Sequence, residues 1–193
     1  MPQQPTSRLS NLLGALSLAV ADQIREATEQ AAGVSDAGPA ALVSLRESPS
    51  ERTIEELRQL VGLTHSGGVR LVDRLSDLGY VTRRLRPPGR SVVVTLTPDG
   101  VAAADRIERA RAEVLDRALR SLSESEQELL ASNVSTVISD IARDRLTRRA
   151  AGRPPLGGAL CRMCDFTACG RDFGRCPAQA AAATLSSRTD HAE

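Results

Sequence analysis

The sequence predicts a mainly α-helical fold with one small α+β unit, in which two short helices are followed by a two-stranded hairpin. Three observations predict this fold. Apolar residues recur at helical spacing in long stretches near both ends of the region 7–149. Between these stretches lie two short helical segments that are separated by Gly62-Leu63. The hydrophobic period then changes at Tyr80, where two β-rich runs begin.

Four predicted helices surround this unit, over about 7–32, 39–46, 101–121 and 124–149. The first carries an apolar stripe made of Leu9, Leu12, Leu13, Leu16, Val20 and Ile24. The last carries a second stripe made of Leu130, Val134, Val137 and Ile141. One such stripe is usually an ordinary core face. Two stripes at opposite ends of a chain with so few aromatic residues favour an interface between two copies, so a homodimer is expected.

The two short helices in the middle carry clear start and stop signals. Thr53 and Glu56 have the spacing of a capping box at the start of the first, and Gly62 closes that helix. Thr64 can cap the second helix, which should stop at Gly79. This order of short helix, turn and short helix is that of a helix-turn-helix.

The hairpin should form a wing beside the helix-turn-helix. Its strands are expected over 80–86 and 91–97, joined by Pro87-Pro88-Gly89-Arg90. This turn is neither Asn-Gly nor Asp-Gly, so a longer, projecting loop is expected. In such a unit the second helix enters the major groove of DNA and presents its N-terminal residues to base edges.

Charge supports an interface with double-stranded DNA. Residues 64–90 contain six arginines against Asp73 and Asp77, a local excess of +4 in a chain of net charge +1. The candidate DNA-binding residues are Thr64, His65, Ser66, Gly67, Gly68, Arg70, Arg74, Arg84, Arg86 and Arg90. Gly67-Gly68 breaks helix preference. Either the first helical turn is frayed there, or the backbone approaches DNA closely.

Several of these segments carry a family resemblance. They are LT at 63–64, VRLVDRL at 69–75, LGYVTR at 78–83 and VTLTPDG at 94–100. Over about 7–149 the chain resembles the MarR family of bacterial transcriptional regulators. The resemblance implies a winged-helix homodimer on a pseudo-palindromic operator, usually a repressor, whose first and last helices intertwine. It also implies a small-molecule effector, often an aromatic acid. The family's wing usually carries Asp-x-Arg, whereas this chain has Pro88-Gly89-Arg90.

All four cysteines lie near the C-terminus, at Cys161, Cys164, Cys169 and Cys176. Their spacing, C-x2-C-x4-C-x6-C, can surround one metal centre, either Zn²⁺ or an iron–sulfur cluster. A thiol switch between Cys161 and Cys164 is a further reading, and four free thiols are another. The sequence predicts a linker at 151–160, a metal-binding module at 161–180 and a flexible tail at 181–193. Phe166 and Phe173 are expected to pack over the centre.

Other classes of function find little support. The N-terminal segment is not typical of a secretory signal, and no apolar run is long enough to span a membrane, so a cytoplasmic protein without a membrane partner is expected. No Ser-His-Asp set, carboxylate pair or phosphate loop is apparent, and His65 and His191 are the only histidines. An enzyme is therefore not expected. The rivals to a metal- or redox-responsive regulator are a ligand-responsive regulator with a structural zinc and an electron carrier or redox enzyme.

Overall fold

The computed structural model describes residues 7–48, 50–86, 91–153 and 157–189. In these residues the chain forms seven α-helices, a three-stranded sheet and one short 3-10 helix. The elements in chain order are α1 (Arg8–Ala32), α2 (Gly38–Arg46), β1 (Arg52–Thr53), α3 (Ile54–Val61), α4 (His65–Asp77), β2 (Val81–Arg86), β3 (Ser91–Leu96), α5 (Pro98–Leu119), α6 (Glu124–Ala150), η1 (Arg171–Phe173) and α7 (Pro177–Thr189). The mainly α-helical fold with a winged helix is thus confirmed.

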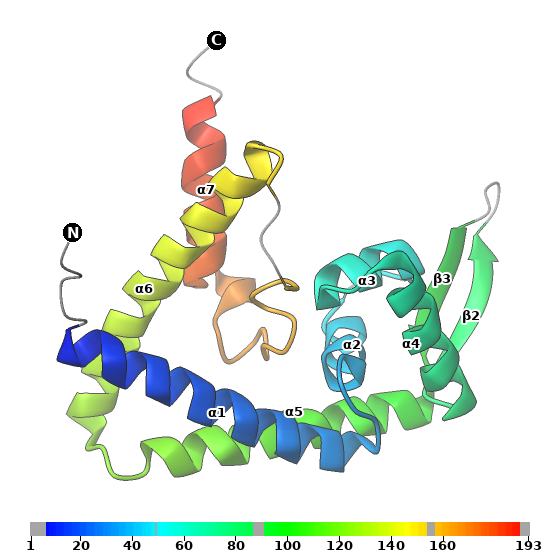
Figure 1. Cartoon of the computed structure of the whole chain (residues 1–193), viewed down its shortest axis with the longest axis horizontal. Helices are drawn as coiled ribbons and strands as arrows, with labels where there is room; N and C mark the ends of the chain where they lie inside the picture. Colours follow the sequence, from blue (N-terminus) through cyan, green and yellow to red (C-terminus); the bar gives the residue numbers. More distant parts are fainter. Residues whose placement is uncertain (1–6, 49, 87–90, 154–156, 190–193) are drawn as a thin grey trace, which may run out of the picture.

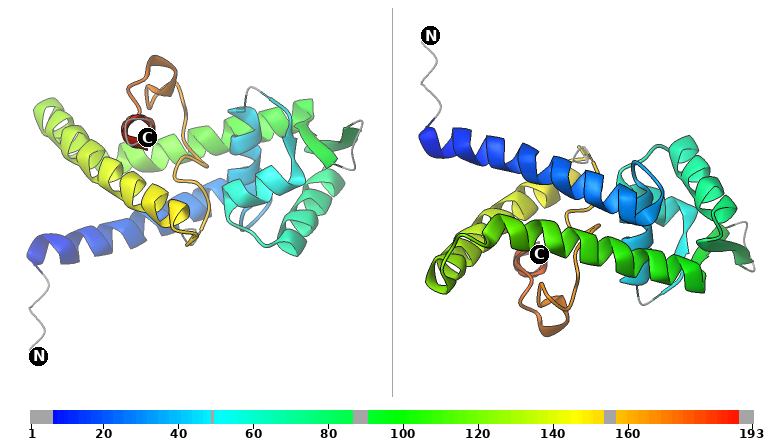
Figure 2. Two further views of the ribbon diagram at one scale, coloured as in Figure 1. Left: turned by 90° about the horizontal axis from the view of Figure 1, so that it is seen from above. Right: turned by 90° about the horizontal axis from the view of Figure 1, so that it is seen from below.

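The winged helix lies at one end of the molecule and the C-terminal helices lie at the other. Helices α1 and α5 run side by side and join the two ends (Figures 1 and 2). Helix α6 turns away from the end of α5, and α7 lies along it (Figure 1). The cysteine-containing segment passes through the space between these C-terminal helices and α3.

Local sequence signals position the helix-turn-helix. Thr53 and Glu56 form the predicted capping box: the Glu56 backbone N–H donates to Thr53 Oγ1, and the Glu56 carboxylate accepts from the Thr53 N–H at 2.7 Å. Gly62 ends α3 with φ 80°, a left-handed conformation that favours glycine. Thr64 then caps α4 by accepting a hydrogen bond from the Gly67 N–H at 3.2 Å. The turn between α3 and α4 is therefore held by hydrogen bonds between residues that are close together in the sequence.

The sheet has the strand order β1-β3-β2, and all pairs are antiparallel. The hairpin register pairs Val81 with Leu96 and Arg86 with Ser91. Strand β1 was not predicted, because its two residues have no apolar alternation and are held only by pairing with Val93 and Val94. The loop at 87–90 lies outside the described residues.

The core is aliphatic, as the composition predicts. It joins the end of α1 to α2, α3, α4, the inner strand and α5, with Leu42, Leu57, Leu75 and Ile107 among its fully buried side chains. Tyr80 is the aromatic residue packed against it, and its hydroxyl donates to the Ala32 carbonyl at 2.9 Å. Both phenylalanines lie in the cysteine-containing segment, outside this core.

The C-terminal part of the chain differs from the expected linker, module and tail. Residues 157–160 are docked on α3 and do not form a free linker, because Gly158 is buried and the Ala159 N–H donates to the Leu60 carbonyl at 2.6 Å. The expected tail from 181 is helical as far as Thr189, and Ala181 is buried. The alanine-rich composition explains this helix, since alanine has the highest helix propensity.

Candidate DNA-binding surface and four-thiol segment

The N-terminal turn of α4 is presented to the outside of the molecule. Thr64, His65 and Ser66 are all exposed, and the His65 side chain is 78% accessible. His65 Nδ1 lies 3.8 Å from the Glu55 carboxylate at the start of α3. Hydrogen bonds from Arg58 and Gln59 lower the pKa of Glu55, so this carboxylate stays charged beside the helix start. Helix α4 is regular from His65 onward, so of the two alternatives for Gly67-Gly68 a frayed first turn finds no support.

Gly68 has a packing role. It is buried, and a Cβ atom added to it would lie 2.6 Å from Cβ of Arg58 on α3. The absence of a side chain therefore lets α3 and α4 pack closely against each other. Gly67 is only partly buried, and its Cβ would lie 3.1 Å from Thr64 Oγ1. Of the two adjacent glycines, only Gly67 remains a candidate for close approach to DNA.

The two arginines of α4 differ in their partners. Arg70 is exposed, and its Nε lies 3.4 Å from the Ser66 carbonyl. Arg74 lies 3.7 Å from the Asp36 carboxylate, in the loop before α2. Within the described part of the chain, Arg70 makes no ion pair, so its charge is available to a ligand.

The β2 arginines lie on both faces of the wing. Arg83 pairs with Asp73 of α4, and Arg84 donates to both oxygens of Glu51, at 2.6 and 2.8 Å. Arg86 is exposed, and no ion pair to it occurs among the described residues. Arg90 lies outside the described residues.

These pairs reduce the charge excess that the window 64–90 suggested. Two of the acidic partners, Asp36 and Glu51, lie outside that window and reach it only through the fold. Arg74 and Arg84 are therefore exposed to solvent but also form ion pairs with Asp36 and Glu51. Arg70 and Arg86 retain unpaired positive charge, on the recognition helix and on the wing.

The architecture has clear counterparts among solved structures. A MarR family protein from Bacillus stearothermophilus matches with a TM-score of 0.61 at 22% identity, over 69% of this chain and 92% of that chain. MepR, a transcription regulator of the Staphylococcus aureus multidrug efflux pump MepA, matches with a TM-score of 0.62 at 18% identity, over 70% of this chain and 99% of that chain. This chain has the fold of the MarR family.

A third structure with the MarR fold was solved with a ligand. CouR from Rhodococcus jostii RHA1, bound to p-coumaroyl-CoA, matches with a TM-score of 0.54 at 20% identity, over 70% of this chain and 95% of that chain. No protein-family model matches the sequence, and no curated protein matches it significantly. All three structural matches cover about two thirds of the chain, so the likeness leaves the remaining third without a counterpart.

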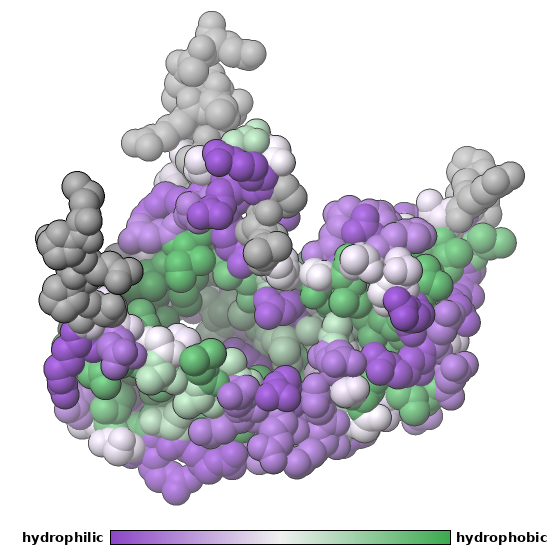
Figure 3. Space-filling model, in the orientation of Figure 1, coloured by the Kyte–Doolittle hydropathy of each residue, from purple (hydrophilic) through white to green (hydrophobic). Residues whose placement is uncertain are grey.

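In this version of the MarR fold, two helices leave apolar faces uncovered. On α1 the exposed leucines are Leu9, Leu12, Leu13, Leu16 and Leu18. On α6 the exposed apolar residues are Leu129, Leu130, Val134, Val137 and Ile141. Figure 3 shows hydrophobic surface over α1 and the adjoining part of α6, beside a hollow between the C-terminal helices and the winged helix. Of the residues of α6, only Ala142 is buried. The predicted stripe on α6 and the leucines of the predicted stripe on α1 therefore face outward, whereas Val20 and Ile24 of the α1 stripe are partly buried.

The four cysteines are brought close together by the segment 161–176. The thiol of Cys161 interacts with those of Cys164 and Cys176, and the thiol of Cys169 also interacts with that of Cys176. Cys176 is only 4% exposed and directly precedes α7, and its carbonyl accepts from the Ala180 N–H. All four cysteines are free thiols. The four predicted ligands thus lie near one another, and metal binding by them stays a prediction.

The cluster is not closed into a finished metal site. In the part of the chain that the structure describes, no group of three or more histidine, cysteine, aspartate or glutamate side chains is placed to hold a metal ion. The hydrogen bond between the Cys161 and Cys164 thiols raises the pKa of Cys161 and lowers the pKa of Cys164 to about 7. The charge of Arg111 on α5 also lowers the pKa of Cys164. Burial raises the pKa of Cys169.

The phenylalanines do not form the expected small core over the cysteines. Phe173 is 66% exposed, and the Arg175 guanidinium lies 5.3 Å from its ring centroid. Phe166 is half-buried under Arg171, whose guanidinium carbon lies 4.4 Å from the ring centroid. The expectation is therefore wrong for Phe173. The segment is held instead by its contacts with the winged-helix unit.

Those contacts tie the thiol segment to α2. Ser44 Oγ of α2 donates to the Arg162 carbonyl at 3.0 Å. The Phe166 N–H donates to the Glu47 carboxylate at 2.9 Å, and Met163 packs against the main core. The segment is therefore part of the same folded unit as the winged helix.

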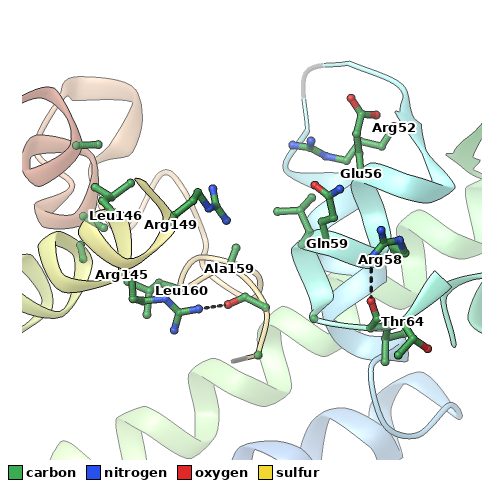
Figure 4. Close-up of a pocket in the computed structure, with 18 residues that line it drawn as sticks. Arg52, Glu56, Arg58, Gln59, Thr64, Arg145, Leu146, Arg149, Ala159 and Leu160 are labelled. Atoms are coloured by element: carbon green, nitrogen blue, oxygen red, sulfur yellow. Dashed lines mark hydrogen bonds between the residues drawn. The ribbon is translucent and has the colours of Figure 1, made fainter. Parts of the chain in front are cut away.

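An open cleft of about 1060 Å³ separates α3 from α6 and α7. Arg52, Glu56 and Gln59 line one wall, and Arg149 and Leu146 line the other (Figure 4). The floor is the segment 157–160, where Arg145 donates to the Gly158 carbonyl at 2.5 Å. Nε of Arg52 is buried and has no hydrogen-bond partner among the described residues.

None of the described helices is long and apolar enough to cross a membrane.

Proposed function

We propose that this protein is a transcriptional regulator that binds double-stranded DNA as a homodimer, and that it acts as a repressor. The observation that carries the proposal is the exposed N-terminal turn of α4 beside a basic wing, within the MarR fold. In a helix-turn-helix, this turn is the part of the recognition helix that contacts base edges. The proposal assigns the protein no catalytic activity.

Each exposed group has a definite role in this proposal. Thr64, His65 and Ser66 face the major groove, where hydroxyl and imidazole groups can hydrogen-bond to base edges. Arg70 lies one turn further along and carries an unpaired charge, so it contacts either a guanine or a phosphate. Arg86 and Arg90 on the wing reach the phosphates or the minor groove beside it.

The apolar faces of α1 and α6 supply the dimer interface. A monomer with both faces in water would expose more contiguous hydrophobic surface than soluble proteins usually do. A two-fold interface buries the same surface on both copies. It would also place two copies of α4 on one side of the assembly, which requires an operator with two related half-sites.

The cleft between α3 and α6 is our candidate site for a small-molecule effector. The guanidinium groups of Arg52 and Arg149 line opposite walls and favour an anionic ligand, with the Glu56 carboxylate beside Arg52 as the one acidic group among the lining residues. A ligand there would contact both the winged helix and the C-terminal helices. Aromatic carboxylates should raise the melting temperature of the wild type but not of Arg52→Ala. Equal shifts for both proteins would remove Arg52 from the effector site.

Selection of binding sites from a random duplex pool tests the main proposal. The expected product is a pseudo-palindrome whose half-sites lie about 10 base pairs apart, one helical turn. The Arg70→Ala variant should lose affinity for this site. Arg117→Ala is a matched control, since Arg117 is exposed in the last turn of α5, and this end of α5 lies away from the winged helix (Figure 1). No enriched sequence, or a site without two-fold symmetry, would contradict the proposal.

A further inference from the structure

The four cysteine thiols form a cluster although they come from three different turns. Cys161 and Cys164 belong to one turn, in which the Cys164 N–H donates to the Cys161 carbonyl at 3.1 Å. Cys169 lies in the next turn, and Cys176 directly precedes α7. Thiol contacts link Cys164 to Cys161, Cys161 to Cys176, and Cys176 to Cys169. A single disulfide needs only one pair, so it does not account for the chain of interactions that links all four thiols.

Positive charge surrounds the cluster. Arg111 of α5 lies near the Cys164 thiol, and Arg171 of η1 lies near the Cys161 thiol. The N-terminus of the 13-residue helix α7 begins next to Cys176, and its backbone dipole also favours negative charge. Four thiolates around a divalent metal carry a net charge of about −2. Two arginines and a helix N-terminus offset a charge of that size.

We infer that Cys161, Cys164, Cys169 and Cys176 bind one thiophilic metal centre per chain, either a zinc ion or an iron–sulfur cluster. The thiols interact in pairs, although among the described residues no three of them are placed around one metal position. The loops between them contain only two, four and six residues, so closing them around a metal costs little entropy. Gly170 and Gly174 have φ of 71° and 68°, so two of the turns already use left-handed conformations that only glycine adopts freely.

Closure of this centre would act on the helix-turn-helix, because the segment before Cys161 is in contact with α3. The Ala159 N–H donates to the Leu60 carbonyl at 2.6 Å. Gly158 approaches so closely that a Cβ atom on it would lie 2.1 Å from the same carbonyl. A shift of Cys161 is therefore transmitted through two residues to the last turn of α3. The effect on operator affinity rests on the proposed DNA-binding function, whereas metal binding does not.

The experiment uses the full chain, purified without oxygen. Metal analysis and an absorption spectrum are measured for the wild type, Cys164→Ser, Cys176→Ser and the control Thr167→Ser. We expect one zinc per chain in colourless protein, or iron and sulfide with absorption near 400 nm. Both cysteine variants should lose the bound metal, because serine is a poor ligand for soft metals, and the control should keep it. Circular dichroism shows whether each variant remains folded.

Two results would overturn the inference. One is a wild type that holds no metal and cannot be reconstituted with zinc or with iron and sulfide. The other is full metal content in both cysteine variants. A protein that holds no metal but loses two hydrogens on mild oxidation would be a thiol switch instead, which also overturns the metal site.

Hydrogen exchange separates this inference from the proposed function. Metal removal should speed exchange of the Ala159 amide, which faces α3. It should also change operator affinity by about 5- to 150-fold, the usual range of allosteric coupling. Metal binding and slowed exchange without any DNA binding would refute the proposed function and leave the metal site intact. Operator binding by a protein that binds no metal would refute the metal site and leave the proposed function intact.

Discussion

Replacing Gly68 with alanine tests the packing of the recognition helix. Gly68 is the fourth residue of α4 and is buried against α3. The added Cβ would lie 2.6 Å from Cβ of Arg58, whereas non-bonded carbon atoms prefer about 3.5–4.0 Å. Cβ of Arg58 is fixed to the backbone of α3, so one of the two helices must move by about 1 Å.

Two terms of opposite sign set the size of the effect. Overpacking of this kind costs about 1–3 kcal/mol. Glycine to alanine in a helix interior gains about 1 kcal/mol. The free energy of unfolding should therefore fall by about 1 kcal/mol for Gly68→Ala. Gly67→Ala gains the same helix propensity, but its Cβ would lie 3.1 Å from the Thr64 hydroxyl and at ordinary contact distances of 3.5 and 3.7 Å from Leu63. The difference between the two variants thus isolates the contact with Arg58.

Urea unfolding followed by far-ultraviolet circular dichroism measures this difference, at one fixed protein concentration because a dimer's stability depends on it. We expect Gly68→Ala to be less stable than Gly67→Ala by about 1–3 kcal/mol. Equal stability of the two variants, or a more stable Gly68→Ala, would show that α3 and α4 do not pack as closely at this point as we describe.

Three further predictions concern the cap, the dimer and the wing. Thr53→Ala should lower the free energy of unfolding by about 1 kcal/mol, because it removes the capping box. Hydrogen bonds from Thr53 lower the pKa of Glu56 in the folded state, so this stabilisation is present above the pKa of the unfolded chain and is lost as the pH falls through the lower folded value. Unfolding followed against pH should show that loss in the wild type but not in Glu56→Gln. Leu16→Asp should give a monomer or an aggregate in analytical ultracentrifugation, because Leu16 is 55% exposed on the α1 face; an unchanged dimer would exclude this face from the interface. Arg86→Ala should reduce the salt dependence of DNA binding by about two counterions per dimer, one from each copy, and an unchanged slope would exclude Arg86 from the phosphate contacts.

Features that depend on neighbouring residues could be predicted from the sequence. The capping box at Thr53 and Glu56, the left-handed glycine at Gly62 and the two strands of the hairpin all follow from signals within a few residues. The exposed stripes on α1 and α6 were also visible, since their spacing follows the helical period. Local propensity and the final fold agree in these elements.

Features that depend on contacts between distant segments could not be predicted. Strand β1 exists only because it pairs with β3, about 40 residues later in the chain. The acids that pair with Arg74 and Arg84 come from Asp36 and Glu51, so a charge count over one window missed them. Gly68 has its packing role because Arg58 faces it from another helix.

The C-terminal segment shows the same limit. Composition suggested a Gly-Pro linker at 151–160. Gly158 is instead buried, because α3 leaves no room for a side chain at this position. Glycine thus serves both as a sign of a loop and as a residue for close backbone contact. From their spacing the four cysteines were expected to share one metal centre, which stays a prediction. Their docking on α2 through Ser44 and Glu47 had no signal in the sequence.

Titration of the selected duplex with protein, at several salt concentrations, tests whether the protein binds DNA as a dimer through its arginines. Sedimentation gives the number of chains per duplex, and fluorescence anisotropy gives the affinity. We expect two chains per duplex. We also expect the logarithm of the association constant to fall linearly with the logarithm of the salt concentration, with a slope of several units, because arginines of both copies contact phosphates. One chain per duplex, or an affinity that salt does not change, would contradict a dimeric winged-helix regulator.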